Sequence, residues 1–350
     1  DYPLERLPHS VVEQLEATES GASLKNIVVM TREQREIIFA DARQHALGVL
    51  YHLQNFVHDR ADDKTNSFRK FHLSKEFGTD DRLPPKPYIR ESLRLKAMYM
   101  MREQDGRNRD GETKTKAQPR FSHVMYPDGL FAWQFHYDFH RTGRTYLIDE
   151  GNRGPWIDYH KPNRHTRFLS DRSLFSLRSL IPESMDGLLG AQGNVGYSSI
   201  VSAAIRLHDQ RVHIGQAAGA TAAVSLNSHQ QPRAFPYDRE KLEMIRNALC
   251  GGTRTSVPLL LWPFRDMSPA HGSFVAVNRL AMLGLLPLSP REVDFHPDVS
   301  AEPVWMREVM RRGRIGLDMP LDSITRAQFC EVVWKQVQRQ DCQQYAFCIV

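Results

Sequence analysis

A glycine-rich segment followed by small residues is the part of this chain best suited to chemistry. Glycines at positions 187, 190, 193 and 196 lead into Ser198 and Ser199, and a run of alanine and glycine extends from Gly215 to Ala223. Glycines at the start of a helix let a bulky anionic or planar ligand approach the backbone, where N–H groups and the helix dipole favour negative charge. A tight strand-to-helix turn also uses glycines, so a purely structural role is the alternative.

The segment 178–226 resembles the C-terminal end of the FAD-dependent oxidoreductase family, which is built on the glutathione-reductase-like flavin fold. The residues that match the family pattern without a gap are Leu180-Ile181-Pro182, Asp186, Leu188-Leu189, Ala191, Arg206 and Gly215-Gln216-Ala217-Ala218-Gly219. A second match, PPKPYIRESLR, begins at Pro84. The resemblance covers residues 30 to 226, which correspond to the later half of a family member.

This resemblance implies a site for FAD and a small organic substrate. It implies a backbone cradle for the flavin and its ribityl chain, together with a nearby arginine: Ala191, Gln192, Gly193, Gly196, Ser198, Ser199 and Arg206. Gln192 and Gly193 stand where the family pattern has a glycine and an arginine, so one positive charge of that pattern is absent.

Three polar residues upstream are candidates for catalysis. Asp138 and His140 stand two positions apart in a predicted strand, so both point to one face. Near a flavin, such an acid/base pair would take a hydroxyl proton while a hydride leaves the neighbouring carbon; a hydrogen-bonded structural pair is the alternative. Arg90 is a candidate for contact with a substrate carboxylate or the flavin, or for a structural ion pair with Glu91. His136 and His140 lack a third ligand, so no metal is predicted.

The turn that would hold the FAD pyrophosphate is absent from the sequence. No G-x-G-x-x-G occurs in the 350 residues, although the family opens with one. We therefore expect the C-terminal portion of a flavin-dependent oxidoreductase, which binds FAD only with an N-terminal half or subunit that these residues lack. The alternatives are a non-catalytic, envelope-associated scaffold subunit that retains a remnant of the fold, and a structural subunit whose partner supplies the Rossmann half.

The predicted elements favour an α/β or α+β fold. Apolar residues at steps of three and four predict one amphipathic helix over residues 31–58, and Thr31 with Gln34 predicts a capping box at its start. Alternating or aromatic-rich segments predict a mixed or antiparallel substrate-domain sheet formed by residues 88–101, 122–126 and 130–140. Further along the chain, residues 237–249 predict a helix and residues 256–262 a strand.

We expect three regions along the chain. Residues 1–177 would hold the first helix and the sheet, residues 178–232 would return into the FAD-binding layer, and residues 233–350 would form a small helical domain. The last region resembles a degenerate S-layer homology module, through Phe295-x-Pro297-Asp298 and Ile324-Thr325-Arg326-Ala327-x-Phe329. A plain helical cap is the alternative, whereas a true module would allow cell-envelope association.

Composition excludes several other classes of protein. The chain is 41% hydrophobic and 25% charged, as is usual for a globular protein. The sequence contains no run of 18 apolar residues, so it predicts no membrane span. The net charge is +5, and the basic stretch 107–120 lacks the aromatic residues that nucleic-acid contact would need. Four cysteines without a C-x-x-C pair argue against zinc and fit thiols or one disulfide. Envelope, secreted and cytoplasmic locations all stay open.

Overall fold

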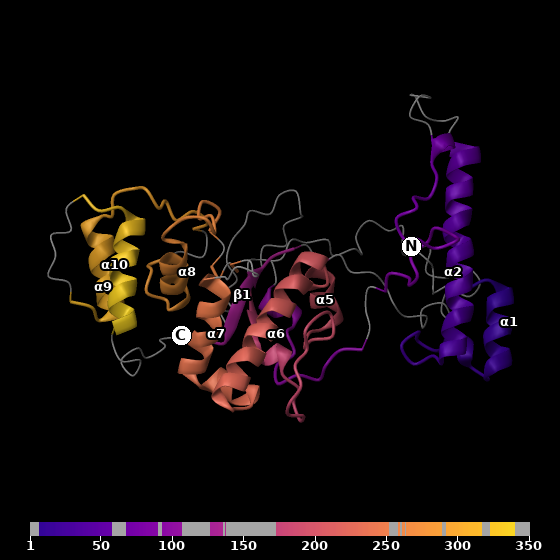
Figure 1. The fold of residues 1–350 in the computed structure, drawn as a ribbon, viewed down its shortest axis with the longest axis horizontal. Coiled ribbons are helices and arrows are strands. Elements are labelled where there is room, and N and C mark those ends of the chain that lie inside the picture. The colour runs from indigo at the N-terminus through magenta and orange to yellow at the C-terminus, as the bar shows by residue number, and fades with distance from the viewer. Residues whose placement is uncertain are drawn as a thin grey trace. The chain divides into compact units, whose positions relative to one another are not determined.

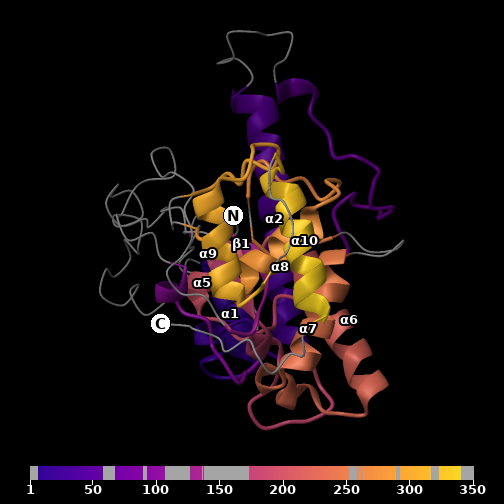
Figure 2. The same cartoon turned by 90° about the vertical axis from the view of Figure 1, so that its left-hand side faces the viewer.

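The computed structural model describes most of the chain in two compact units. The described residues are 7–57, 68–89, 93–106, 127–135, 137, 173–251, 258–259, 261–262, 264–288, 292–316 and 323–339. The first unit contains the described residues up to 89, and the second contains those from 93 onward. Figures 1 and 2 show both units, and the glycine-rich segment belongs to the second.

The first unit is a pair of helices joined by a short turn, followed by an irregular segment. Its helices are α1 (His9–Thr18), η1 (Ala22–Leu24), α2 (Arg32–His52), the π-helical turn η2 (Leu53–Val57) and η5 (Phe68–Lys70). The predicted capping box is confirmed: the Gln34 amide donates to Thr31 Oγ1 at 3.2 Å, and the Thr31 amide donates to Gln34 Oε1 at 3.0 Å.

The predicted apolar stripe of the long helix is buried only near its start. Among the positions that defined the stripe, Ile38 lies in a small core with Val11, Leu15, Ala22 and Met30. The later positions are half-buried or exposed. Helix α1 has 10 residues and α2 has 21, so α1 covers only the first part of α2. Periodicity indicated the helix correctly, but not what packs against it.

The sheet is much smaller than predicted. The described part of the chain contains one antiparallel pair, β1 (Gly129–Trp133) and β2 (Ser173–Ser176), with Ala132 opposite Leu174. Residues 93–101 form isolated bridges and no strand, because their amides bond to turns rather than to a neighbouring strand. The described structure is therefore mainly helical and α+β at most, and the prediction of an α/β fold with a larger mixed sheet is wrong for these residues.

Helices are the main regular elements among the described residues of the second unit. In chain order they are η6 (Glu103–Asp105), η8 (Leu177–Leu180), α5 (Ser199–Ile205), α6 (His208–Ser228), η9 (Pro232–Tyr237), α7 (Arg239–Gly251), α8 (Phe274–Met282), α9 (Pro303–Gly313) and α10 (Arg326–Arg339). Helices α6 and α7 pack against each other, and both contact β1 (Figure 1). No helix in the described residues is both long enough and apolar enough to cross a bilayer.

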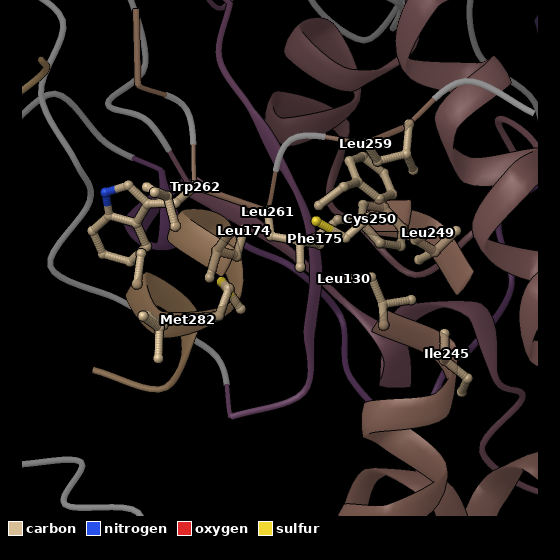
Figure 3. Close-up of a cluster of buried hydrophobic side chains, with 14 of the residues drawn as sticks. Leu130, Leu174, Phe175, Ile245, Leu249, Cys250, Leu259, Leu261, Trp262 and Met282 are labelled. Atoms are coloured by element: carbon tan, nitrogen blue, oxygen red, sulfur yellow. The ribbon is translucent and has the colours of Figure 1, made fainter. Parts of the chain in front are cut away.

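A single hydrophobic core runs through this unit. Figure 3 shows one cluster of buried side chains that includes Leu130 of β1, Phe175 of β2, Leu249 of α7, Met282 of α8 and Leu259, which lies between α7 and α8 in the sequence. Residues on both sides of the predicted boundary at 232 thus share one interior. The predicted strand over 256–262 is not formed at residues 258–259 and 261–262, and its other residues lie outside the described chain.

The two halves of the S-layer-like pattern meet in space. The Arg326 amide donates to the Val299 carbonyl at 2.9 Å, and the Ala327 amide donates to the Pro297 carbonyl at 3.0 Å. Asp266 accepts hydrogen bonds from the amides that begin the first half, at 2.7 and 2.6 Å. This turn joins α8, α9 and α10 into one helical region, and its likeness to an S-layer module stays a prediction.

Candidate functional site

The glycine-rich turn packs along an extended segment from a distant part of the sequence. The Leu95 amide donates to the Asn194 carbonyl at 2.9 Å, and the Met101 amide donates to the Gly196 carbonyl at 3.0 Å. Residues 95–101 therefore support both the middle and the end of the turn. The sequence match that begins at Pro84 ends at Arg94, directly before this segment.

Gly196 is the point of closest approach between these segments. A Cβ atom at this position would lie 2.4 Å from Ala97 Cβ and 2.5 Å from the Tyr99 carbonyl oxygen. Its amide donates to the Ser179 carbonyl at 2.8 Å, so both backbone groups of Gly196 are used within the protein. The structure therefore accounts for this glycine by packing, and Gly196 lies inside the protein.

The tip of the turn, by contrast, faces solvent. Ala191, Gln192 and Asn194 are exposed, and Gly193 is half-buried. The backbone N–H groups of these four residues donate no hydrogen bond to any residue that the structure describes. Successive N–H groups without internal partners are suited to bind an anionic oxygen.

A guanidinium group lies beside these amides. A Cβ atom on Gly193 would be 3.1 Å from Arg211 Nη2, and one on Gly215 would be 3.4 Å from the Ala191 carbonyl oxygen. Arg211 and Gly215 are four residues apart on α6 and share one helix face, which therefore lies against the turn. The sequence analysis missed Arg211, although its spacing from the predicted Gly215 was a usable signal.

The two serines after the turn are engaged by the protein itself. Ser198 is the N-cap of α5, and its Oγ accepts from the Val201 amide at 3.3 Å. Ser199 Oγ accepts from Arg94 Nη2 at 2.7 Å. Arg94 is a second residue that was not predicted as part of the site, and its hydrogen bond ties the segment after residue 93 to the start of α5.

The remaining predicted site residues fall into two groups. Arg206 ends α5 with its side chain 3% exposed, so it lies in the interior. The predicted catalytic residues Arg90, Asp138 and His140 all lie outside the described residues, and their roles stay predictions. Within the described part of the chain, no three His, Cys, Asp or Glu side chains are arranged to hold a metal ion.

A buried ion pair supports the segment that precedes the turn. Asp128, whose side chain is 1% exposed, accepts from the Arg178 amide at 2.9 Å, from Arg178 Nε at 3.1 Å and from Ser176 Oγ at 2.7 Å. Arg178 also stacks over the Tyr99 ring at 5.1 Å. Burial is the largest single influence on the pKa of Arg178 and lowers it, but the hydrogen bond to Asp128 and the attraction of the Asp128 charge, with smaller contributions from Tyr237 and Tyr99, together raise the pKa overall.

Comparison with known proteins gives a family match. No curated protein and no solved structure shows significant similarity to the chain. A family model described as FAD dependent oxidoreductase matches residues 6–245, which is more than half of the chain. That range contains the extended segment, both strands, the glycine-rich turn and helices α5 and α6. The chain therefore belongs to the FAD-dependent oxidoreductase family.

Proposed function

We propose that this chain forms the substrate side and one wall of the flavin site in an oxidoreductase that moves a hydride between an organic substrate and FAD. When bound, FAD supplies the group that exchanges the hydride. The dinucleotide-binding turn would come from a segment or subunit other than these 350 residues. The observation that carries the proposal is the exposed tip at residues 191–194, whose N–H groups have no partner among the described residues.

The chemistry of the tip fits an anionic cofactor. Uncommitted amides can donate to phosphate or to an electron-rich ring oxygen, and the Arg211 guanidinium next to Gly193 adds a positive charge. This charge compensates for the arginine of the family pattern that Gly193 replaces. Asp138 and His140 keep their predicted role of taking a substrate proton, and Arg90 that of holding a substrate carboxylate.

The exposed face of α6 is evidence that another element covers this helix. Val212 and Leu226 are 66% and 75% exposed, and Gly219 and Ala223 between them are also exposed. The helix carries no Lys, Arg, Asp or Glu after Arg211. A helix that is uncharged on its outer face as well as its inner face is normally covered by another element. Small residues would let a sheet or helix of the dinucleotide-binding half approach closely.

The test is flavin binding by the chain in its natural assembled form, purified with any partner. We expect FAD to be released on denaturation and identified by mass spectrometry. Gln192→Glu should weaken FAD binding by about tenfold, because it puts a negative charge at the tip. Gln230→Glu adds the same charge at an exposed position beyond α6 and should leave binding unchanged. An assembled protein without flavin, or a Gln192→Glu variant that binds FAD normally, would refute the proposal.

A further inference from the structure

The second unit also contains a pocket. It has a volume of about 140 Å³ and is lined by Phe131, Ala132, His213, Pro258, Leu259 and Pro269. Of these residues, Phe131 and Leu259 are each 1% exposed, whereas Pro269 is exposed. An engineered protein cavity of roughly 150 Å³ holds benzene, so a single six-membered ring fits here.

One polar side chain faces this apolar surface. The His213 ring meets the Phe131 ring edge-on, with centroids 5.7 Å apart and an interplanar angle of 75°. The His213 nitrogens have no hydrogen bond or ion pair with any residue that the structure describes. Burial lowers the pKa of His213, and the smaller opposing effect of Asp209 does not reverse this. A neutral imidazole offers one donor and one acceptor.

The pocket is separate from the glycine-rich turn. Gly215 of α6 lies against the turn, with its Cβ position 3.4 Å from the Ala191 carbonyl oxygen. At 3.6 residues per turn, positions 213 and 215 project about 200° apart around the helix. His213 therefore points away from the proposed flavin wall, and a ligand of this pocket would not be the flavin.

We propose that the pocket binds a small uncharged aromatic ring that carries one hydrogen-bonding group, as in phenols and azoles. The ring would pack on Phe131 and Leu259, and its polar atom would bond to His213. No Lys, Arg, Asp or Glu is among the described lining residues, so a charged ligand would lose its hydration without compensation. The inference depends on the fold of this unit and not on the proposed oxidoreductase activity.

The test uses phenol and toluene as probes, titrated into the full chain and followed by NMR shifts of labelled alanine methyl groups and the histidine ring. Phenol should bind with a Kd of about 1 mM or tighter. Ala132→Leu fills the pocket and should weaken binding at least tenfold. Ala40→Leu makes the same substitution at an exposed position of α2 and should leave the Kd unchanged.

A second variant separates hydrogen bonding from simple apolar partition. His213→Leu should weaken phenol binding severalfold while leaving toluene binding unchanged. The proposal fails if wild-type protein shows no phenol binding at 10 times the expected Kd. It also fails if Ala132→Leu binds phenol normally, or if His213→Leu weakens both probes equally. The flavin content of the assembled protein is a separate measurement that does not depend on phenol binding. Each of the two proposals can therefore fail without the other.

Discussion

Substitution of Gly196 tests how tightly the glycine-rich turn is packed. In Gly196→Ala the new Cβ would lie 2.4 Å from Ala97 Cβ and 2.5 Å from the Tyr99 oxygen, and both neighbours are fixed close to the backbone. Overpacking of this kind costs about 1–3 kcal/mol. Moving the turn away would also weaken its hydrogen bonds to Ser179 and Met101, worth about 1 kcal/mol each. We expect a total loss of roughly 3 kcal/mol.

The assay is thermal and urea unfolding followed by circular dichroism. A loss of roughly 3 kcal/mol lowers the Tm of a unit of about 150–250 residues, such as the second unit, by about 6–12 °C. Gly219→Ala is the matched control, because nothing lies within 4 Å of its Cβ position and α6 is helical there. This control should gain up to about 1 kcal/mol. Equal unfolding midpoints for Gly196→Ala and wild type would show that the turn is not packed as described.

Three further predictions follow from buried and charged groups. Asp128→Asn removes one partner of a buried ion pair and should lower the free energy of unfolding in urea by about 3 kcal/mol. Asp186→Asn removes one partner of an exposed pair and should lower it by under about 1 kcal/mol. Equal losses for the two variants would contradict this prediction. Hydrogen bonds from Arg311 and Arg312 lower the pKa of Glu308 in α9 from 4.5 to about 2. The stabilisation from this carboxylate is therefore fully present above pH 4.5 and is lost as the pH falls through about 2. An NMR titration of labelled glutamate checks it, and a midpoint near 4.5 would disprove it. Burial raises the pKa of Cys250 to about 12 and also raises that of Cys330, so iodoacetamide at neutral pH should modify neither thiol until urea is added; peptide mass spectrometry of the native protein would reveal any exception.

Helices that carry their own local signals were predictable from the sequence. The capping box at Thr31 and the apolar steps after it set the start of α2, and the predicted helix over 237–249 corresponds to α7. Both signals come from residues within a few positions of one another, where the helical repeat decides which side chains are neighbours. The burial of a helix face depends on other elements, which explains the exposed second half of α2.

The sheet and much of the site depend on contacts between distant residues. Alternation predicts a strand over residues 88–101, but the described residues 93–101 form only isolated bridges, and their amides pair with turns such as the one at Ile181. The bond from Arg94 to Ser199 joins residues 105 positions apart, and no local pattern reveals it. The turn itself was identified from its glycines, whereas the division between its buried and exposed parts required the packing against residues 97–99.

The interior shared by the strands and the C-terminal helices affects how this protein can be shortened. Leu249, Leu259 and Met282 lie beyond the end of the family match at residue 245, yet they belong to the same buried cluster as Leu130 and Phe175 within it (Figure 3). A chain cut after residue 245 would expose these side chains to water and would be prone to aggregation and proteolysis. Residues after 245 therefore complete the hydrophobic core of the residues that match the family. Transplanting either part into a relative would require redesign of the apolar surfaces that the two parts share.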